Sequence, residues 1–151
     1  MQGKIHKGFS LSLYWRCQLI GWGLVSIFWF YTSLIRDGFQ WYYSLLNYFL
    51  DVGICIGLTH AYRNLAKEGG WDQLDIKSLL WKVLPALLIL SFLFMLFANL
   101  KWSAFVYLLE GQNRFLQNLG VWNPVLITGL RHMSIWLLGY HLYHFYQREV
   151  Q

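Results

Sequence analysis

The 151-residue sequence predicts an all-α protein that crosses a membrane several times. Its residues are 57% hydrophobic and only 13% charged, whereas soluble domains average about 25% charged residues. Nine tryptophans and ten tyrosines add ring types that favour the two edges of a bilayer. The chain also contains four long apolar stretches. Because a helix satisfies its own backbone in lipid, each stretch is expected to cross as a helix.

The four predicted spans cover residues 15–35, 41–62, 79–100 and 121–146. Each has the length that a helix needs to cross a hydrocarbon core of about 30 Å. Together they predict a polytopic four-helix bundle that forms a single domain over residues 1–151. Between the last two spans, the apolar residues of segment 101–120 fit either a helix on the membrane surface or an extension of the third span. Pro124 suits the first turn of the fourth helix.

The cations predict that both termini lie in the cytoplasm, because lysine and arginine concentrate in cytoplasmic loops. With the N-terminus inside, the two sets of cations are unequal. The inside set is Lys4, Lys7, Arg16, Arg63, Lys67, Lys77, Lys82 and Arg148, and the outside set is Arg36, Lys101 and Arg114. The net charge of +5 is spread along the chain and forms no basic cluster, so no nucleic-acid partner is expected.

Two opposite charges interrupt the second and fourth spans. Asp51 follows Tyr42 by nine residues, and Arg131 follows Trp122 by nine residues. If both spans run in the same direction, both charges reach a depth of about 13 to 14 Å, near the middle of the membrane. A single charge is costly there, so we expect Asp51 to pair with Arg131.

Further polar residues share helix faces with these charges. Asn47, Asp51 and Thr59 recur at multiples of four in the second span, while Ser134 lies near Arg131 in the fourth and Gln18 interrupts the first. We expect these residues to form a polar seam inside the bundle. Two roles of the seam stay open. It forms structural contacts between helices, or the charge pair serves as a functional switch or ligand contact.

Three histidines are expected near the cytoplasmic ends of the spans: His60 in the second, and His141 and His144 in the fourth. Facing imidazoles suit haem or a transition metal. Histidines beside Tyr140 and Tyr143 also suit packing and hydrogen bonding at the membrane edge, so no cofactor or metal is expected.

Several segments resemble the multi-pass membrane region of LytS-like bacterial sensor histidine kinases of the internal-region type. The resemblance lies in YWRCQLIGWG at residues 14–23, LTHAYR at 58–63 and GWDQL at 70–74. It continues with Pro85 at the start of the third helix and YHLYHFYQR at residues 140–148, which resembles the exit helix towards a cytoplasmic kinase domain.

This resemblance implies a sensing and signal-transmitting module of a two-component system in the bacterial inner membrane. It also implies a homodimer and a cytoplasmic kinase or response-regulator partner. No residue matches the family's phosphoacceptor histidine or ATP-binding domain, so His141 and His144 are not taken as kinase histidines and no enzymatic activity is expected of this chain. The alternative function is a small membrane transport or haem- or metal-binding redox protein that uses the seam or the histidines.

Overall fold

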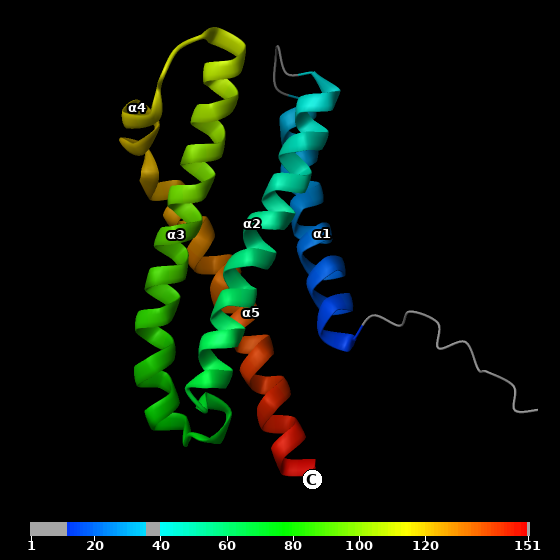
Figure 1. Cartoon of the computed structure of the whole chain (residues 1–151), viewed down its shortest axis with the longest axis vertical. Helices are drawn as coiled ribbons and strands as arrows, with labels where there is room; N and C mark the ends of the chain where they lie inside the picture. Colours follow the sequence, from blue (N-terminus) through cyan, green and yellow to red (C-terminus); the bar gives the residue numbers. More distant parts are fainter. Residues whose placement is uncertain (1–11, 36–39, 151) are drawn as a thin grey trace, which may run out of the picture. The chain divides into compact units, whose positions relative to one another are not determined.

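The computed structural model describes residues 12–35 and 40–150. Within these ranges the chain is helical and has no strand, which confirms the all-α class. The elements are α1 (Leu13–Leu34), α2 (Trp41–Glu68), the 3₁₀ helix η1 (Trp71–Gln73), α3 (Ile76–Glu110), α4 (Phe115–Leu119) and α5 (Trp122–Val150), coloured in chain order in Figure 1. The predicted cations Lys4, Lys7 and Arg36 lie outside the described residues, as do both terminal residues.

Three helices of the described part of the chain are long and apolar enough to cross a membrane: α1, α2 and α3. They overlap the first three predicted spans and indicate a membrane protein. The fourth predicted span also forms a long helix, α5, which has 29 residues. Its histidines and charged residues lower its hydropathy, and it is not among the three. Its crossing therefore stays a prediction.

The helices bury several polar side chains and expose many large apolar ones. Polar side chains such as Gln18, Ser26, Thr59 and Ser91 are almost completely buried, while large apolar side chains such as Leu24, Phe28, Leu88 and Ile89 are exposed. Soluble monomers rarely expose large contiguous apolar surfaces, whereas polar groups in a membrane protein face the protein interior. This pattern agrees with the apolar composition of the chain.

The chain divides into two compact units, residues 1–56 and residues 57–151, and α2 runs through both. The first unit contains α1 and the first half of α2. Within it, the rings of Phe30 and Tyr48 meet edge to face at 6.1 Å between centroids. A methyl group added at Gly23 would lie 3.2 Å from the Tyr48 hydroxyl, so this glycine permits the close approach of the two helices.

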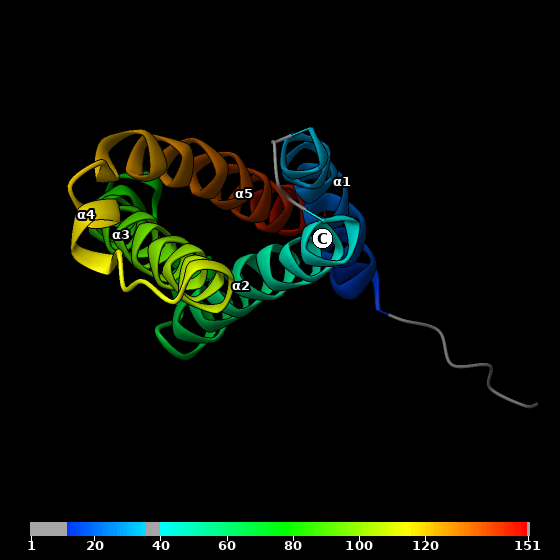
Figure 2. The same cartoon turned by 90° about the horizontal axis from the view of Figure 1, so that it is seen from above.

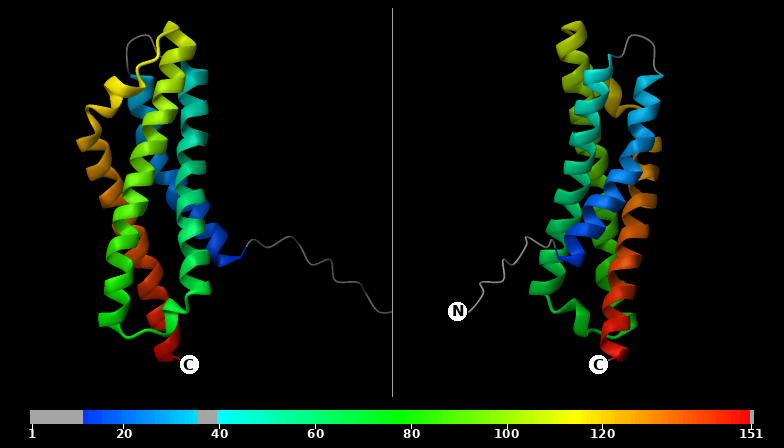
Figure 3. Two further views of the ribbon diagram at one scale, coloured as in Figure 1. Left: turned by 60° about the vertical axis from the view of Figure 1, so that its left-hand side comes forward. Right: turned by 90° about the vertical axis from the view of Figure 1, so that its right-hand side faces the viewer.

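In the second unit, the most extensive packing between elements is that of α3 against α5, which lie side by side (Figures 1 and 3). The backbones approach closely at Gly129, where an added methyl group would lie 2.9 Å from the Phe94 ring and 3.0 Å from the Ser91 carbonyl oxygen. Met133 and Leu137, one and two turns further along α5, are buried. Seen from above, the short α4 lies against α3 (Figure 2).

For residues 101–110, the structure favours an extension of the third span over a separate helix on the membrane surface. Residues 101–110 continue α3, and Gly111 ends the helix in the left-handed conformation with φ 69°. Phe105 and Val106 are buried, so they are not the lipid-facing side of a surface helix. At the other end, the Asp75 side chain caps α3 by accepting a hydrogen bond from the Ser78 backbone N–H at 3.3 Å.

Candidate functional site

The predicted polar residues of the first unit are buried or half-buried on α1 and α2. The Gln18 amide is buried and donates a hydrogen bond to the Tyr14 hydroxyl at 2.8 Å. Asn47 is buried and donates from Nδ2 to Oδ2 of the half-buried Asp51 at 3.0 Å. The structure thus brings Asn47 and Asp51 together on one face of α2.

The other predicted seam residues belong to the second unit. Thr59 is fully buried on α2, Ser134 is half-buried on α5, and Arg131 is exposed on α5. Asp51 and Arg131 belong to different units, and their pairing stays a prediction.

The three histidines all belong to the second unit. His60 on α2 and His144 on α5 are half-buried, while His141 is 8% exposed. In the described part of the chain, no three side chains of histidine, cysteine, aspartate or glutamate gather in a group that could hold a metal ion. His141 instead has a close protein partner.

That partner is Tyr62, near the end of α2. The Tyr62 hydroxyl and Nε2 of His141 form a hydrogen bond of 2.6 Å between residues 79 positions apart in the sequence. The Tyr62 side chain is 2% exposed, so almost no water can compete for this bond. A buried polar pair that loses one partner leaves the other unsatisfied, which makes the contact costly to break.

Aromatic rings surround the Tyr62–His141 contact. The Tyr62 ring meets those of Trp71, Trp136 and Tyr140 edge to face, at centroid distances of 5.7, 6.1 and 6.1 Å. On α5, Trp136 and Tyr140 are stacked at 5.2 Å, and Tyr140 meets the ring of His144 at 4.5 Å. We call these six residues the Tyr62–His141 cluster: Tyr62, Trp71, Trp136, Tyr140, His141 and His144. It joins three elements, α2, η1 and α5.

The turn between α2 and η1 has the shape that places Trp71 in this cluster. A methyl group on Gly69 would collide with the Trp71 indole, and Gly70 has φ 62°, which favours glycine. Lys82 on α3 lies with its Nζ 5.7 Å from the centre of the Trp71 ring, a distance that allows a cation–π contact. The cluster is therefore connected to α3 as well.

The last turn of α5 reaches the same turn region. Arg148 donates from Nη1 to the carbonyl oxygens of Asp72 and Leu74 at 3.4 and 3.5 Å, and its guanidinium lies 4.8 Å from the Phe145 ring centre. These long, exposed bonds are weaker than the buried Tyr62–His141 bond. The end of α5 thus lies beside the connection between α2 and α3.

The sequence pointed to His141, His144 and Tyr140, but it did not mark Tyr62, Trp71 or Trp136 as site residues. One signal could have indicated part of the cluster, because Trp136, Tyr140 and His144 recur every four residues on one face of α5. Nothing in the sequence indicates which residue of another element faces His141.

The arrangement can hold and position α5, since the Tyr62 hydroxyl on α2 and the His141 imidazole on α5 are bonded to each other. Comparison of the chain with protein-family models, with curated proteins and with solved structures found no match.

Proposed function

We propose that this chain is a membrane-embedded sensing and signal-transmitting module, similar to the membrane region of LytS-like sensor histidine kinases. In this proposal α1, α2, α3 and α5 cross the bacterial inner membrane as a four-helix bundle with both termini in the cytoplasm. The module acts as a homodimer and passes its signal to a cytoplasmic kinase or response regulator. The lipid bilayer surrounds the exposed apolar faces.

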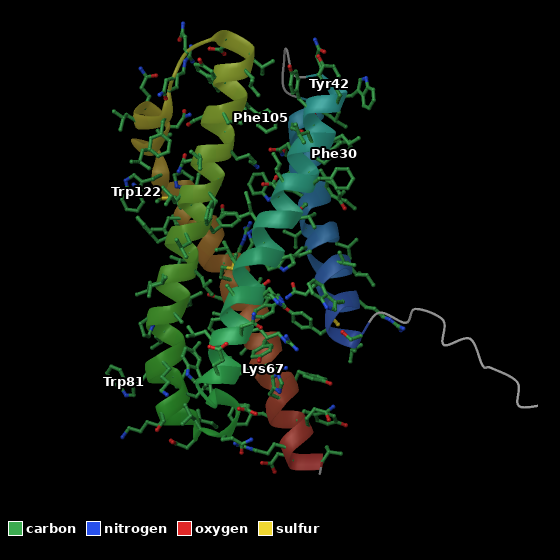
Figure 4. All side chains as sticks on the ribbon, viewed as in Figure 1. Phe30, Tyr42, Lys67, Trp81, Phe105 and Trp122 are labelled. Carbon is green, nitrogen blue, oxygen red and sulfur yellow. The ribbon has the colours of Figure 1, made fainter. Side chains whose placement is uncertain are left out.

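Two tryptophan–lysine pairs within α3 support a membrane crossing of defined depth. The pairs Trp81–Lys82 and Lys101–Trp102 place the two tryptophans 21 residues apart, a rise of about 31 Å along a helix. This length matches a hydrocarbon core of about 30 Å. Tryptophan and lysine side chains favour the edges of that core. Figure 4 shows Trp81 near one end of α3 and Phe105, beyond the second pair, towards the other end.

The position of α5 supports a fourth crossing. Its last turn bonds to the turn that precedes α3 through Arg148. Its first residue, Trp122, follows α4, whose Asn118 bonds to Ser103 beside the second tryptophan–lysine pair. Helix α5 therefore extends between the same two levels as α3 and in the opposite direction, as a second crossing would (Figure 3).

The Tyr62–His141 contact is the observation that supports transmission of a signal from α2 to α5. It connects the end of α2 to α5, which is the helix that would leave the membrane towards a downstream domain. An uninterrupted helix can carry a displacement along its length. A stimulus that changes the packing of α2, around the proposed Asp51–Arg131 pair, would therefore reach the end of α5 through this contact.

A fusion protein tests this proposal. The cytoplasmic region of a LytS-like kinase is joined after Gln151, and its autophosphorylation is measured in proteoliposomes. We expect Tyr62→Phe to change the activity by about 5-fold or more, the range of an allosteric coupling. The matched control Tyr143→Phe, an exposed tyrosine on α5, should leave it unchanged. Equal activities of both folded variants would contradict a transmitting role.

The charge pair is tested in the same fusion. Asp51→Ala leaves Arg131 without its proposed partner, so we expect a loss of regulation or of folded protein. Adding Arg131→Leu should partly restore what was lost, because no single charge then remains in the lipid. A double variant as impaired as Asp51→Ala alone would count against the pair. A haem absorption band in the purified protein would instead favour the redox alternative.

A further inference from the structure

The short helix α4 lies at the level where α3 reaches the edge of the lipid. Helix α3 has 35 residues, a length of about 52 Å, so it is longer than the hydrocarbon core is thick. If Trp102 marks the edge, residues 103–110 extend beyond it. After Gly111 the chain turns back, and Nδ2 of Asn118 on α4 donates to the Ser103 hydroxyl at 3.1 Å. Because Ser103 follows Trp102 directly, α4 returns to the membrane edge.

Two further contacts hold this return in place. Arg114 pairs with Glu110 at the end of α3, with 2.7 Å between Nη2 and Oε2. At the start of α4, the Phe115 backbone N–H donates a hydrogen bond to Oδ1 of Asn113 at 3.1 Å. Arg114 at the start of α4 and Asn118 near its end are therefore both bonded to α3.

This segment exposes apolar side chains at the level of the edge. Leu116 is 80% exposed and Val121 is 68% exposed, the highest exposure of any leucine or valine in the described residues. Along the chain they lie between Trp102, which is eight residues before the end of α3, and Trp122, the first residue of α5. Gln117, the neighbour of Leu116, is also exposed and gives the segment a polar side.

We propose that α4 and the turn after it form an interfacial anchor whose Leu116 and Val121 enter the lipid between headgroups and acyl chains. Lipid is the occupant because the bond from Asn118 to Ser103 holds α4 beside Trp102, and because exposed leucine and valine next to interfacial tryptophans favour the edge of a bilayer. This anchor fixes the level at which α5 enters the membrane. The inference rests on the proposed crossing of α3, and it does not depend on a signalling role.

Spin labels at neighbouring positions of α4 test the anchor. The native Cys17 and Cys55 are replaced by serine and alanine, and a nitroxide is attached to Leu116→Cys or to the matched control Gln117→Cys. The protein is reconstituted in phosphatidylcholine vesicles, and collisions of the label with oxygen and with a water-soluble nickel chelate are measured. Oxygen concentrates in lipid, so we expect a severalfold higher ratio of oxygen to nickel collisions at 116 than at 117. Val121→Cys should give a ratio like that at 116.

Two outcomes would overturn the anchor. Equal ratios at 116 and 117, with free access of the nickel chelate, would place α4 in water. Low access of both reagents at 116 would show that a second copy or another protein covers Leu116. A label at Leu88→Cys, which is exposed in the middle of α3, tests separately whether α3 crosses the membrane. If the label at 88 is in lipid and the label at 116 is not, α3 crosses and the anchor alone is wrong.

Discussion

In the first unit, Gln18 bonds to Tyr14 and Asn47 bonds to Asp51, each one turn away on the same helix. In the second unit, Tyr62 bonds to His141 on a different helix, and Asn118 of α4 bonds to Ser103 of α3. Bonds within one helix can form before helices pack, whereas bonds between helices require the packed arrangement. The second unit thus has polar contacts that specify its tertiary structure.

The first unit differs in a further respect. The indole nitrogen of Trp22 and the hydroxyl of Ser44 are buried there without a hydrogen-bond partner among the described residues. Buried polar groups are normally paired. Within the described residues, the buried side-chain polar groups without a hydrogen-bond partner thus lie in the first unit.

The largest effect is expected where α3 and α5 approach most closely. Gly129→Leu should lower the free energy of unfolding by about 3 kcal/mol, because even a methyl group there would overlap Phe94 and the backbone of Ser91. The matched control is Gly139→Leu on the same helix, where an added methyl group would meet no atom within 4 Å. Unfolding in detergent micelles, followed by circular dichroism, measures both. Equal stabilities would show that the helices do not touch at Gly129.

Loss of the contact between α2 and α5 should be the next largest effect. Tyr62→Phe removes the hydroxyl and leaves Nε2 of His141 buried without a partner, at a cost of about 2 kcal/mol. Tyr143→Phe, at an exposed position, should cost almost nothing. The same unfolding measurement applies. A Tyr62→Phe variant as stable as the unchanged protein would remove the main difference between the two units.

The helices themselves could be predicted, since apolar stretches mark where the chain must satisfy its backbone in lipid. Their ends could not. Helix α2 continues past Tyr62 to Glu68 and α3 continues past Leu100 to Glu110, because hydropathy reports the edge of the membrane and not the end of a helix. Helix α3 ends at Gly111, the first glycine after its start, which takes the left-handed conformation that closes the helix.

The candidate site was predictable only where it is local. A spacing of four in the sequence indicates that Asn47 and Asp51 share a helix face. The Tyr62–His141 bond joins residues 79 positions apart, and which pair meets depends on how α2, η1 and α5 pack. Neither the fold of the turn at Gly69 nor the position of Trp71 follows from helical spacing.

A local bond in the first unit should matter less. Asn47→Ala removes the bond to Asp51, and we expect a cost of about 0.6 kcal/mol, the average for polar contacts in membrane helices. Val52→Ala, a half-buried apolar position of the same helix, serves as a reference for loss of packing alone. A cost as large as that of Tyr62→Phe would show that both units depend equally on their polar contacts.

The smallest effect concerns the cap of α3, in the turn that the proposed topology places in water. The pKa of Asp75 lies below its ordinary value of 3.8, because the side chain and backbone of Ser78 bond to its carboxylate. Its stabilisation is therefore fully present above pH 3.8 and is lost as the pH falls through the lowered pKa. Asp75→Asn keeps a capping oxygen but does not titrate, so its unfolding should depend less on pH in this acidic range. Identical pH profiles would contradict the cap.

The most direct test of the account maps the sides of the membrane that the second unit reaches. Single cysteines replace the exposed residues Gln73, Gln112 and Glu149 in a chain without Cys17 and Cys55, and intact cells are treated with a membrane-impermeant maleimide. If α3 and α5 both cross, Gln112→Cys reacts from outside, and Gln73→Cys and Glu149→Cys react only after the cells are opened. Reaction of Glu149→Cys from the same side as Gln112→Cys would show that α5 does not cross, and the proposed exit of the signal through this helix would be wrong.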